Sequence, residues 1–196
     1  LEEVLKRGLG SLLDESRYYL SADPKNSFFQ ASVICLEATI AYIQRYESII
    51  RAVAEGRNVT DVDAHACVLL PEDPVAEKKR RQELQHLSKV LANIATKPAN
   101  DFYDAVQLLW LMCVVLQHES NASSISLGRA DQYLLPYFYT SLNSGVPISD
   151  LRELLQCFFL KTNTIVFVRS KASAEFFAGF PTGYNLVIGG IDSKGA

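Results

Sequence analysis

The sequence predicts a mainly helical chain with about one β-strand, which forms part of a larger fold. Apolar residues repeat at helical spacing along most of the chain, which indicates amphipathic helices. The segment 102–116 is apolar almost all the way round, as expected for a helix enclosed by other elements. One short apolar segment, 184–190, is bounded by turn-forming residues and is typical of a buried strand.

The first two helices are predicted from apolar spacing and from their ends. Apolar residues between positions 4 and 13 favour a helix, although Gly8 and Gly10 weaken this pattern. After the break at 23–26, Ser27 is expected to cap a long core helix that Gly56 ends. The long helix would be a core helix with one polar face.

A third helix is expected to begin at Asp73 and Pro74, after an irregular stretch at 61–71. Its charged block, 77–83, contains basic residues with neighbouring glutamates, which favours a solvated face over a nucleic-acid contact. Residues 97–100 end this helix. The segment carries no feature that predicts chemistry.

The enclosed helix at 102–116 is expected to be capped by Asn100 or Asp101. A further helix over 131–142 would be bent or interrupted by Pro136, and another would run from about 149 to 162. The strand at 184–190 then has no partner strand in the predicted elements. We therefore expect its neighbours to come from sequence outside this chain, and both chain ends to be cut.

Composition excludes several partners. The 196 residues contain 19 basic and 22 acidic side chains, so a net charge of −3 gives no attraction to nucleic acid or to an anionic membrane. The longest apolar run, 108–116, is shorter than the roughly 20 residues of a membrane-spanning helix, and no signal segment opens the chain. We expect a cytoplasmic protein, with 1–196 forming one partial domain.

The cysteines and histidines do not predict a metal site or a disulfide framework. Their positions follow none of the common ligand spacings, which favours buried free thiols. The cysteines are Cys35, Cys67, Cys113 and Cys157, and the histidines are His65, His86 and His118.

A dense polar patch follows the enclosed helix. It consists of residues 117–121 and continues, after a few residues, at 126–134. Unpaired buried polar groups cost roughly 1–3 kcal/mol each, so these groups must be satisfied internally or displayed at a site. The patch is therefore a constrained junction.

Four groups of residues occur in a recognisable order. They are Ala105-Val106-Gln107-Leu108-Leu109-Trp110, then Glu119-Ser120-Asn121, then Ser126-x-Gly128-Arg129-x-Asp131-Gln132-Tyr133-Leu134-x-Pro136-Tyr137, and later Asn185-Leu186-x-x-Gly189-Gly190. This order resembles the glycyl radical enzyme family, specifically its pyruvate formate-lyase-like branch of glycerol and diol dehydratases and choline lyases. The resemblance covers about half the chain and implies that the chain is an internal N-terminal portion of such an enzyme, made of helices and one strand of an α/β barrel.

The resemblance also implies a mechanism and partners. In the family, a glycyl radical near the C-terminus takes a hydrogen atom from a cysteine on a loop inside the barrel, and the thiyl radical then abstracts a substrate hydrogen. Neither the Gly-Cys-x-Glu loop nor the glycyl radical motif is present, so no catalytic residue is assigned and the chain alone is expected to be inactive. The family further implies a homodimer, an iron–sulfur S-adenosylmethionine activating enzyme, and a lyase that binds no metal itself.

Six residues are considered as candidates. Ser173 matches a position at which dehydratases present a serine to the substrate, and a hydroxyl suits this role because it both donates and accepts. A local turn serine is an equal alternative. Arg169 could pair with a substrate carboxylate, but a scaffold ion pair is favoured. A structural polar network is expected among four residues, Glu119, Asn121, Arg129 and Asp131.

Three functions remain open at this point. The first is a portion of a glycyl radical lyase or dehydratase that cleaves a C–O, C–N or C–C bond of a small polar substrate. The second is a non-catalytic helical scaffold or partner-binding module derived from the same fold. The third is an unrelated helical binding domain.

Overall fold

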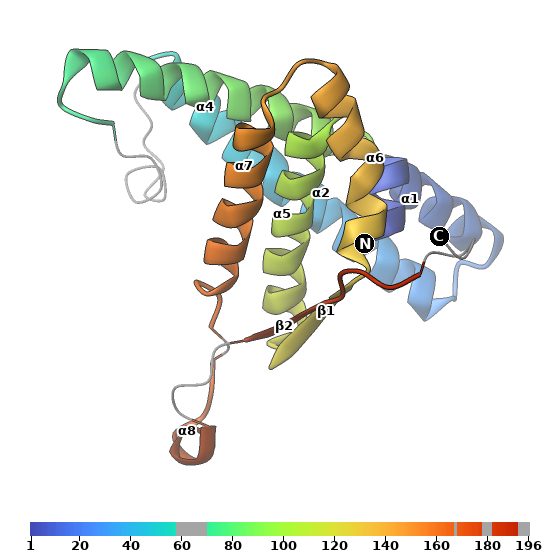
Figure 1. Ribbon diagram of the computed structural model, residues 1–196. Helices are drawn as coiled ribbons and strands as arrows, with labels where there is room; N and C mark the ends of the chain where they lie inside the picture. Colours follow the sequence, from blue (N-terminus) through green and yellow to red (C-terminus); the bar gives the residue numbers. More distant parts are fainter. Residues whose placement is uncertain (58–69, 167, 178–181, 192–196) are drawn as a thin grey trace. The chain divides into compact units, whose positions relative to one another are not determined.

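The computed structural model describes residues 1–57, 70–166, 168–177 and 182–191. These residues divide into two compact units, one formed by Leu1–Leu5 with Ala99–Ala196 (unit 1) and the other by Lys6–Pro98 (unit 2). Figure 1 shows helices throughout both units and two adjacent strands, so the prediction of a mainly helical chain is confirmed. Whether 1–196 acts as one domain stays a prediction.

The described residues of unit 2 form three helices. They are the larger part of α1 (Glu2–Ala22), α2 (Ser27–Ala54) and α4 (Pro74–Ile94). Helices α2 and α4 pack along each other, and Ile43, Leu84 and Ile94 are almost completely buried in the core. The third predicted helix begins as expected, because the Asp73 carboxylate accepts a hydrogen bond from the Ala76 amide at 2.8 Å.

Two details of unit 2 differ from expectation. The cap of α2 is Asn26 rather than Ser27, because the Asn26 side chain accepts from the amides of Phe28 and Phe29. Gly8 is not a weak point in α1 but a kink with a φ of 75°. A Cβ atom there would lie 2.5 Å from the Lys97 carbonyl carbon, so only glycine allows this close approach.

Unit 1 combines helices with a two-stranded sheet. Its elements are α5 (Phe102–Ser120), β1 (Ser124–Gly128), α6 (Ala130–Asn143), α7 (Ile148–Thr162), α8 (Lys171–Phe177) and β2 (Gly183–Leu186). Helix α5 lies between α6 and α7 (Figure 1). It is buried on most of its faces, as predicted, and the Asp101 side chain caps it. Pro136 lies inside α6 without ending it.

The strand near the C-terminus does have a partner, so the prediction of a lone strand is wrong. Strands β1 and β2 pair in parallel, with Ser124 opposite Gly183 and Ile125 opposite Tyr184. Strand β1 escaped prediction because its serines face outward and only Ile125 and Leu127 are buried. This alternation marks a half-buried strand inside the polar patch. No third strand joins the sheet among the residues that the structure describes.

Strand β2 is also shorter and less enclosed than expected. It ends at Leu186 rather than at 190, and Val187 and Ile188 are exposed. The amide of Val187 still donates to the Gly128 carbonyl at 3.0 Å. Two strands alone cannot cover both faces of this segment, which explains its exposure.

The thiols are less buried than predicted. Cys113 is buried, and burial raises its pKa to about 12. Cys35 and Cys157 are free but exposed. Cys67 and His65 lie outside the described residues. No helix in the described part of the chain is long and apolar enough to cross a membrane.

Candidate functional site

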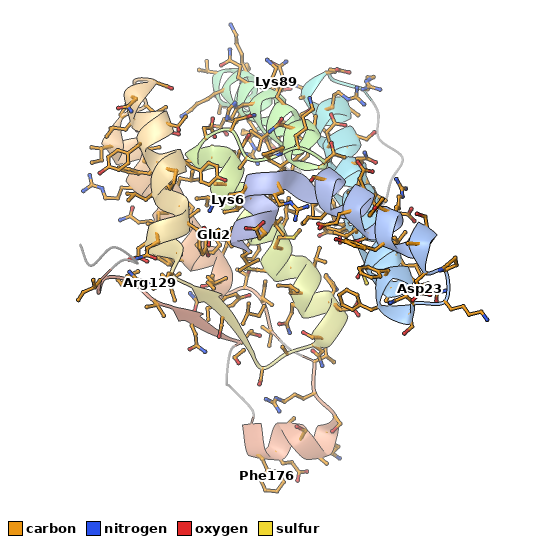
Figure 2. All side chains as sticks on the ribbon, turned by 90° about the vertical axis from the view of Figure 1, so that its right-hand side faces the viewer. Glu2, Lys6, Asp23, Lys89, Arg129 and Phe176 are labelled. Atoms are coloured by element: carbon orange, nitrogen blue, oxygen red, sulfur yellow. The ribbon has the colours of Figure 1, made fainter. Side chains whose placement is uncertain are left out.

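The candidate site is built around strand β1, which separates two polar groups at its two ends. Before β1 stands Asn121, the residue that ends α5, with a left-handed φ of 45°. After β1, the chain turns at Gly128 and passes through Arg129 into α6 (Figure 2). The predicted network residues therefore do not form one cluster.

At the end of β1, Arg129 and Asp131 form a forked ion pair. The Nε and Nη2 groups of Arg129 donate to the two carboxylate oxygens of Asp131 at 3.1 and 3.2 Å. Asp131 also accepts from the Gly189 amide at 2.9 Å, and Arg129 donates to the Ile191 carbonyl at 3.4 Å. The pair thus holds the segment after β2 against the start of α6.

The environment of Asp131 favours its charged form. The hydrogen bond from Arg129 is the main cause that lowers the Asp131 pKa, with further help from the amide of Gly189 against partial burial. Both side chains remain partly exposed. This pair is therefore a partly exposed clamp between the start of α6 and the segment after β2.

At the beginning of β1, Asn121 binds the main chain of the segment that leads to α8. Its amide nitrogen donates to the Val168 carbonyl at 2.7 Å, and its oxygen accepts from the Val168 amide at 2.8 Å. Its own backbone amide donates to the Gln117 carbonyl at the end of α5. Asn121 therefore joins α5 to the connection between α7 and α8.

Glu119 takes part in neither group. It lies exposed in the last turn of α5. Its separation from Arg129 follows from the geometry of a strand, because five extended residues span roughly 16 Å. Sequence proximity alone had suggested a contact.

Ser173 lies in α8, partly exposed, and its hydroxyl oxygen accepts a hydrogen bond from Nη1 of Arg169 at 3.1 Å. The Ser173 amide donates to the Ser170 hydroxyl at 3.3 Å. Because Arg169 directly follows Val168, the Asn121 contact fixes the residue next to it. The proposed substrate serine and the nearby arginine are thus brought together, while their role toward a substrate stays a prediction.

Sequence reasoning missed a set of buried polar groups. Gln117, Thr182 and Tyr184 have polar side-chain atoms that are sealed from solvent and have no hydrogen-bond partner in the described part of the chain. Burial also raises the pKa of Tyr184 to about 12. A signal for Gln117 existed, since it follows Leu109 and Cys113 at intervals of four residues, on the buried face of α5.

Two hollows in unit 1 are lined in part by residues of the candidate site. One has a volume of about 310 Å³ and is almost entirely apolar, with Phe138, Phe158 and Leu186 among its walls. The other, of about 390 Å³, is lined by the end of α5 and by residues after α7, and Gln117 contributes to its wall. No group of three His, Cys, Asp or Glu side chains that could hold a metal ion occurs among the described residues.

Comparisons with known proteins give a consistent result. Residues 71–196 match the model of the pyruvate formate lyase-like family. Among curated proteins, the probable dehydratase YbiW of Escherichia coli is 29% identical across 95% of this chain and 22% of its own length. The (2S)-3-sulfopropanediol dehydratase of Klebsiella oxytoca is 30% identical across 87% of this chain and 19% of its length. The chain thus spans about a fifth of these relatives.

Solved structures agree with this match. The chain is similar to the B12-independent glycerol dehydratase of Clostridium butyricum, with a TM-score of 0.79 and 28% identity. It is also similar to a structure on 1,2-propanediol dehydration in Roseburia inulinivorans, with a TM-score of 0.80 and 33% identity. Each comparison covers 99% of this chain and 23% of the other. The chain therefore belongs to the pyruvate formate lyase-like family of glycyl radical enzymes.

Proposed function

We propose that this chain is part of a glycyl radical lyase or dehydratase that cleaves a C–O, C–N or C–C bond of a small polar substrate. The observation that carries the proposal is the similarity to two diol and glycerol dehydratase structures over almost the whole chain. The relatives named as dehydratases, and the isethionate sulfite-lyase of Desulfovibrio desulfuricans at 27% identity, point to the same reaction class. All of these names describe the removal of a small group from a small substrate.

The proposed reaction requires residues that this chain does not contain. A glycyl radical takes the hydrogen atom of a cysteine thiol, and the thiyl radical then abstracts a hydrogen atom from a substrate carbon. The substrate radical loses its leaving group, and the product radical regains a hydrogen atom from the thiol. Because the sequence has neither the Gly-Cys-x-Glu loop nor the radical glycine motif, the chain alone is expected to be inactive.

Partners and location belong to the same proposal. The radical would be installed by an activating enzyme with an iron–sulfur cluster and S-adenosylmethionine, and the lyase itself would bind no metal. The longer protein would be a homodimer of the cytoplasm, active in anaerobic metabolism because oxygen destroys glycyl radicals. These expectations follow from the family alone.

Ser173 is the proposed substrate contact. Its oxygen accepts from Arg169, so the hydroxyl hydrogen remains available to donate to a substrate oxygen. Arg169 would then be a positioning residue that fixes the serine rotamer. Asn121 would support both by holding the main chain at Val168.

The test uses the longer protein obtained from the native reading frame. After anaerobic activation, electron paramagnetic resonance should detect a glycyl radical, and product should form from a diol, a polyol or a hydroxysulfonate. A reading frame that stops after Ala196 would instead support the scaffold alternative. Absence of a radical after activation of a longer protein with both motifs would also refute the enzyme proposal.

The Ser173→Ala variant tests the substrate contact within this enzyme. Loss of one hydrogen bond to substrate should lower kcat/KM about tenfold while the radical signal stays unchanged. The matched control is Ser144→Ala, an exposed serine at the end of α6 whose hydroxyl donates only to the Thr140 carbonyl. Equal kinetics for the two variants would assign Ser173 a local structural role.

A further inference from the structure

The unpaired amide of Gln117 lies in an unusual position. The residue is 8% exposed, and neither its amide nitrogen nor its amide oxygen has a hydrogen-bond partner among the residues that the structure describes. Fully buried amides are almost always paired in native proteins, because an unpaired one destabilises the fold. The amide of Gln117 therefore indicates a partner that the described residues do not supply.

Asn121, the residue that caps α5 four positions after Gln117, shows what such a partner can be. Its side-chain amide exchanges two hydrogen bonds with the main chain at Val168, one as donor and one as acceptor. A carboxamide can pair in this way because its N–H and C=O groups stand side by side, like those of a peptide. Gln117 has the same chemical groups and lies on the same side of the helix end.

The space for a second main-chain contact is present. Gln117 and Asn121 both line the hollow of about 390 Å³, together with apolar side chains that include Val114, Ile165 and Val166. Amide groups beside apolar walls suit an extended peptide, which offers its main chain to the amide and its side chains to the walls. The glutamine side chain has three rotatable bonds, so its amide can turn into the hollow when a partner is present.

We propose that this hollow, which we call the Gln117 pocket, receives an extended main-chain segment of the same polypeptide, from the part of its relatives' length that this chain does not span. About four fifths of each curated relative lies outside the matched region. Thr182 and Tyr184, in the same unit, also have buried polar atoms without partners, which supports a covering segment over this unit. The inference rests on the proposed function, because it requires a longer natural protein.

The test compares the change in Tm that one substitution causes in two proteins, and this change is expected to have opposite signs. In the chain 1–196, Gln117→Leu removes an unpaired buried amide, so Tm should stay constant or rise by about 2 °C. In the longer protein, the same substitution strands the N–H and C=O groups of the docked segment, so Tm should fall by at least about 2 °C. Gln117→Met, which is also apolar and similar in size, should repeat both results.

The control is Gln156→Leu on α7, where the glutamine is exposed, and its effect should be small and equal in both proteins. If Gln117→Leu prevents folding of the longer protein but not of the chain 1–196, the result supports the proposal. An unchanged or higher Tm in the longer protein would overturn the proposal. An unchanged Tm with a raised KM would do so too, because the pocket would then hold a small molecule.

The experiments distinguish failure of the docked-segment proposal from failure of the proposed function. A reversal of sign in a longer protein that forms no glycyl radical supports the docked segment and refutes only the enzyme. An active enzyme without reversal refutes only the docked segment. A reading frame that ends at Ala196 refutes both.

Discussion

The two units of the chain differ in how they treat buried polar side chains. In unit 2, Ser16 donates to the Leu12 carbonyl, Thr39 donates to the Cys35 carbonyl, and Ser88 pairs with Glu47. In unit 1, Asp104 and Ser141 accept from the amides of Asn100 and Phe102, but buried polar atoms of Gln117, Thr182 and Tyr184 have no partner among the described residues. The buried polar side chains in the described part of unit 2 therefore find partners within that unit, whereas these three residues of unit 1 do not.

The comparison predicts that each unit has its own stability, and the largest effects should come from its core. Ile43→Ala in unit 2 and Leu108→Ala in unit 1 each remove a fully buried side chain and should cost about 2–5 kcal/mol. Hydrogen exchange on the chain 1–196 should show lost protection mainly in the substituted unit. Equal loss across both units would contradict the division.

The next effect concerns Gly8 in unit 2. Gly8→Ala places a Cβ atom against the main chain of residues 96–98 and should cost about 3 kcal/mol. Gly56→Ala is the matched control, because Gly56 has a similar φ of 74° but its Cβ would meet only the Arg81 Nη1 atom, at an ordinary contact distance of 3.7 Å, so the change should cost about 1 kcal/mol. Urea denaturation compares the two variants. Similar costs would mean that the close approach at Gly8 is not maintained in solution.

A smaller effect is expected at Asn121 in unit 1. Asn121→Ala loses both hydrogen bonds to Val168 and strains the left-handed turn, which together should cost about 2 kcal/mol. Asn121→Gly loses the same bonds but relieves the turn, so its cost should be about 1 kcal/mol. Limited proteolysis near α8 should be faster in both variants. No change in proteolysis would show that Asn121 does not hold this segment.

The smallest predicted effect is the pH dependence at Asp131. Its pKa is lowered in the folded state, so its stabilising contribution is present above the unfolded pKa near 3.8 and is lost as pH falls through the folded value. Asp131→Asn should flatten the fall of Tm below about pH 4, relative to the unsubstituted chain. Glu119→Gln is the control, since Glu119 is exposed and outside the clamp. Identical pH profiles for Asp131→Asn and the unsubstituted chain would count against the clamp.

The sequence predicted the helices well, except α8, because their signals are local. Asp73 and Asp101 could be recognised as caps, since a cap depends only on the residues that follow it. The apolar residues on nearly all faces of α5 correctly predicted an enclosed helix. The exact cap of α2 shifted from Ser27 to Asn26, since both residues can accept from the first turn.

The candidate site was less predictable because it depends on contacts between distant segments. Strand β1 was hidden by Ser124 and Ser126, whose polarity suggested a junction. Once this strand separates the ends of the polar patch, Glu119 cannot reach Arg129. The partners of Asp131 and Asn121 lie 58 and 47 residues away, at Gly189 and Val168, and no local pattern identifies such pairs.

The parallel pairing of β1 and β2 has a consequence for biosynthesis. Since the two strands run in the same direction, the chain must complete α6, α7 and α8 before β2 can meet β1. During translation, the nascent β1 therefore leaves the ribosome with an unpaired edge and waits for its neighbour. Closing so long a loop has an entropic cost, which slows the pairing of β1 with β2. A chaperone that shields nascent strands should therefore matter most while the segment between β1 and β2 is being synthesised.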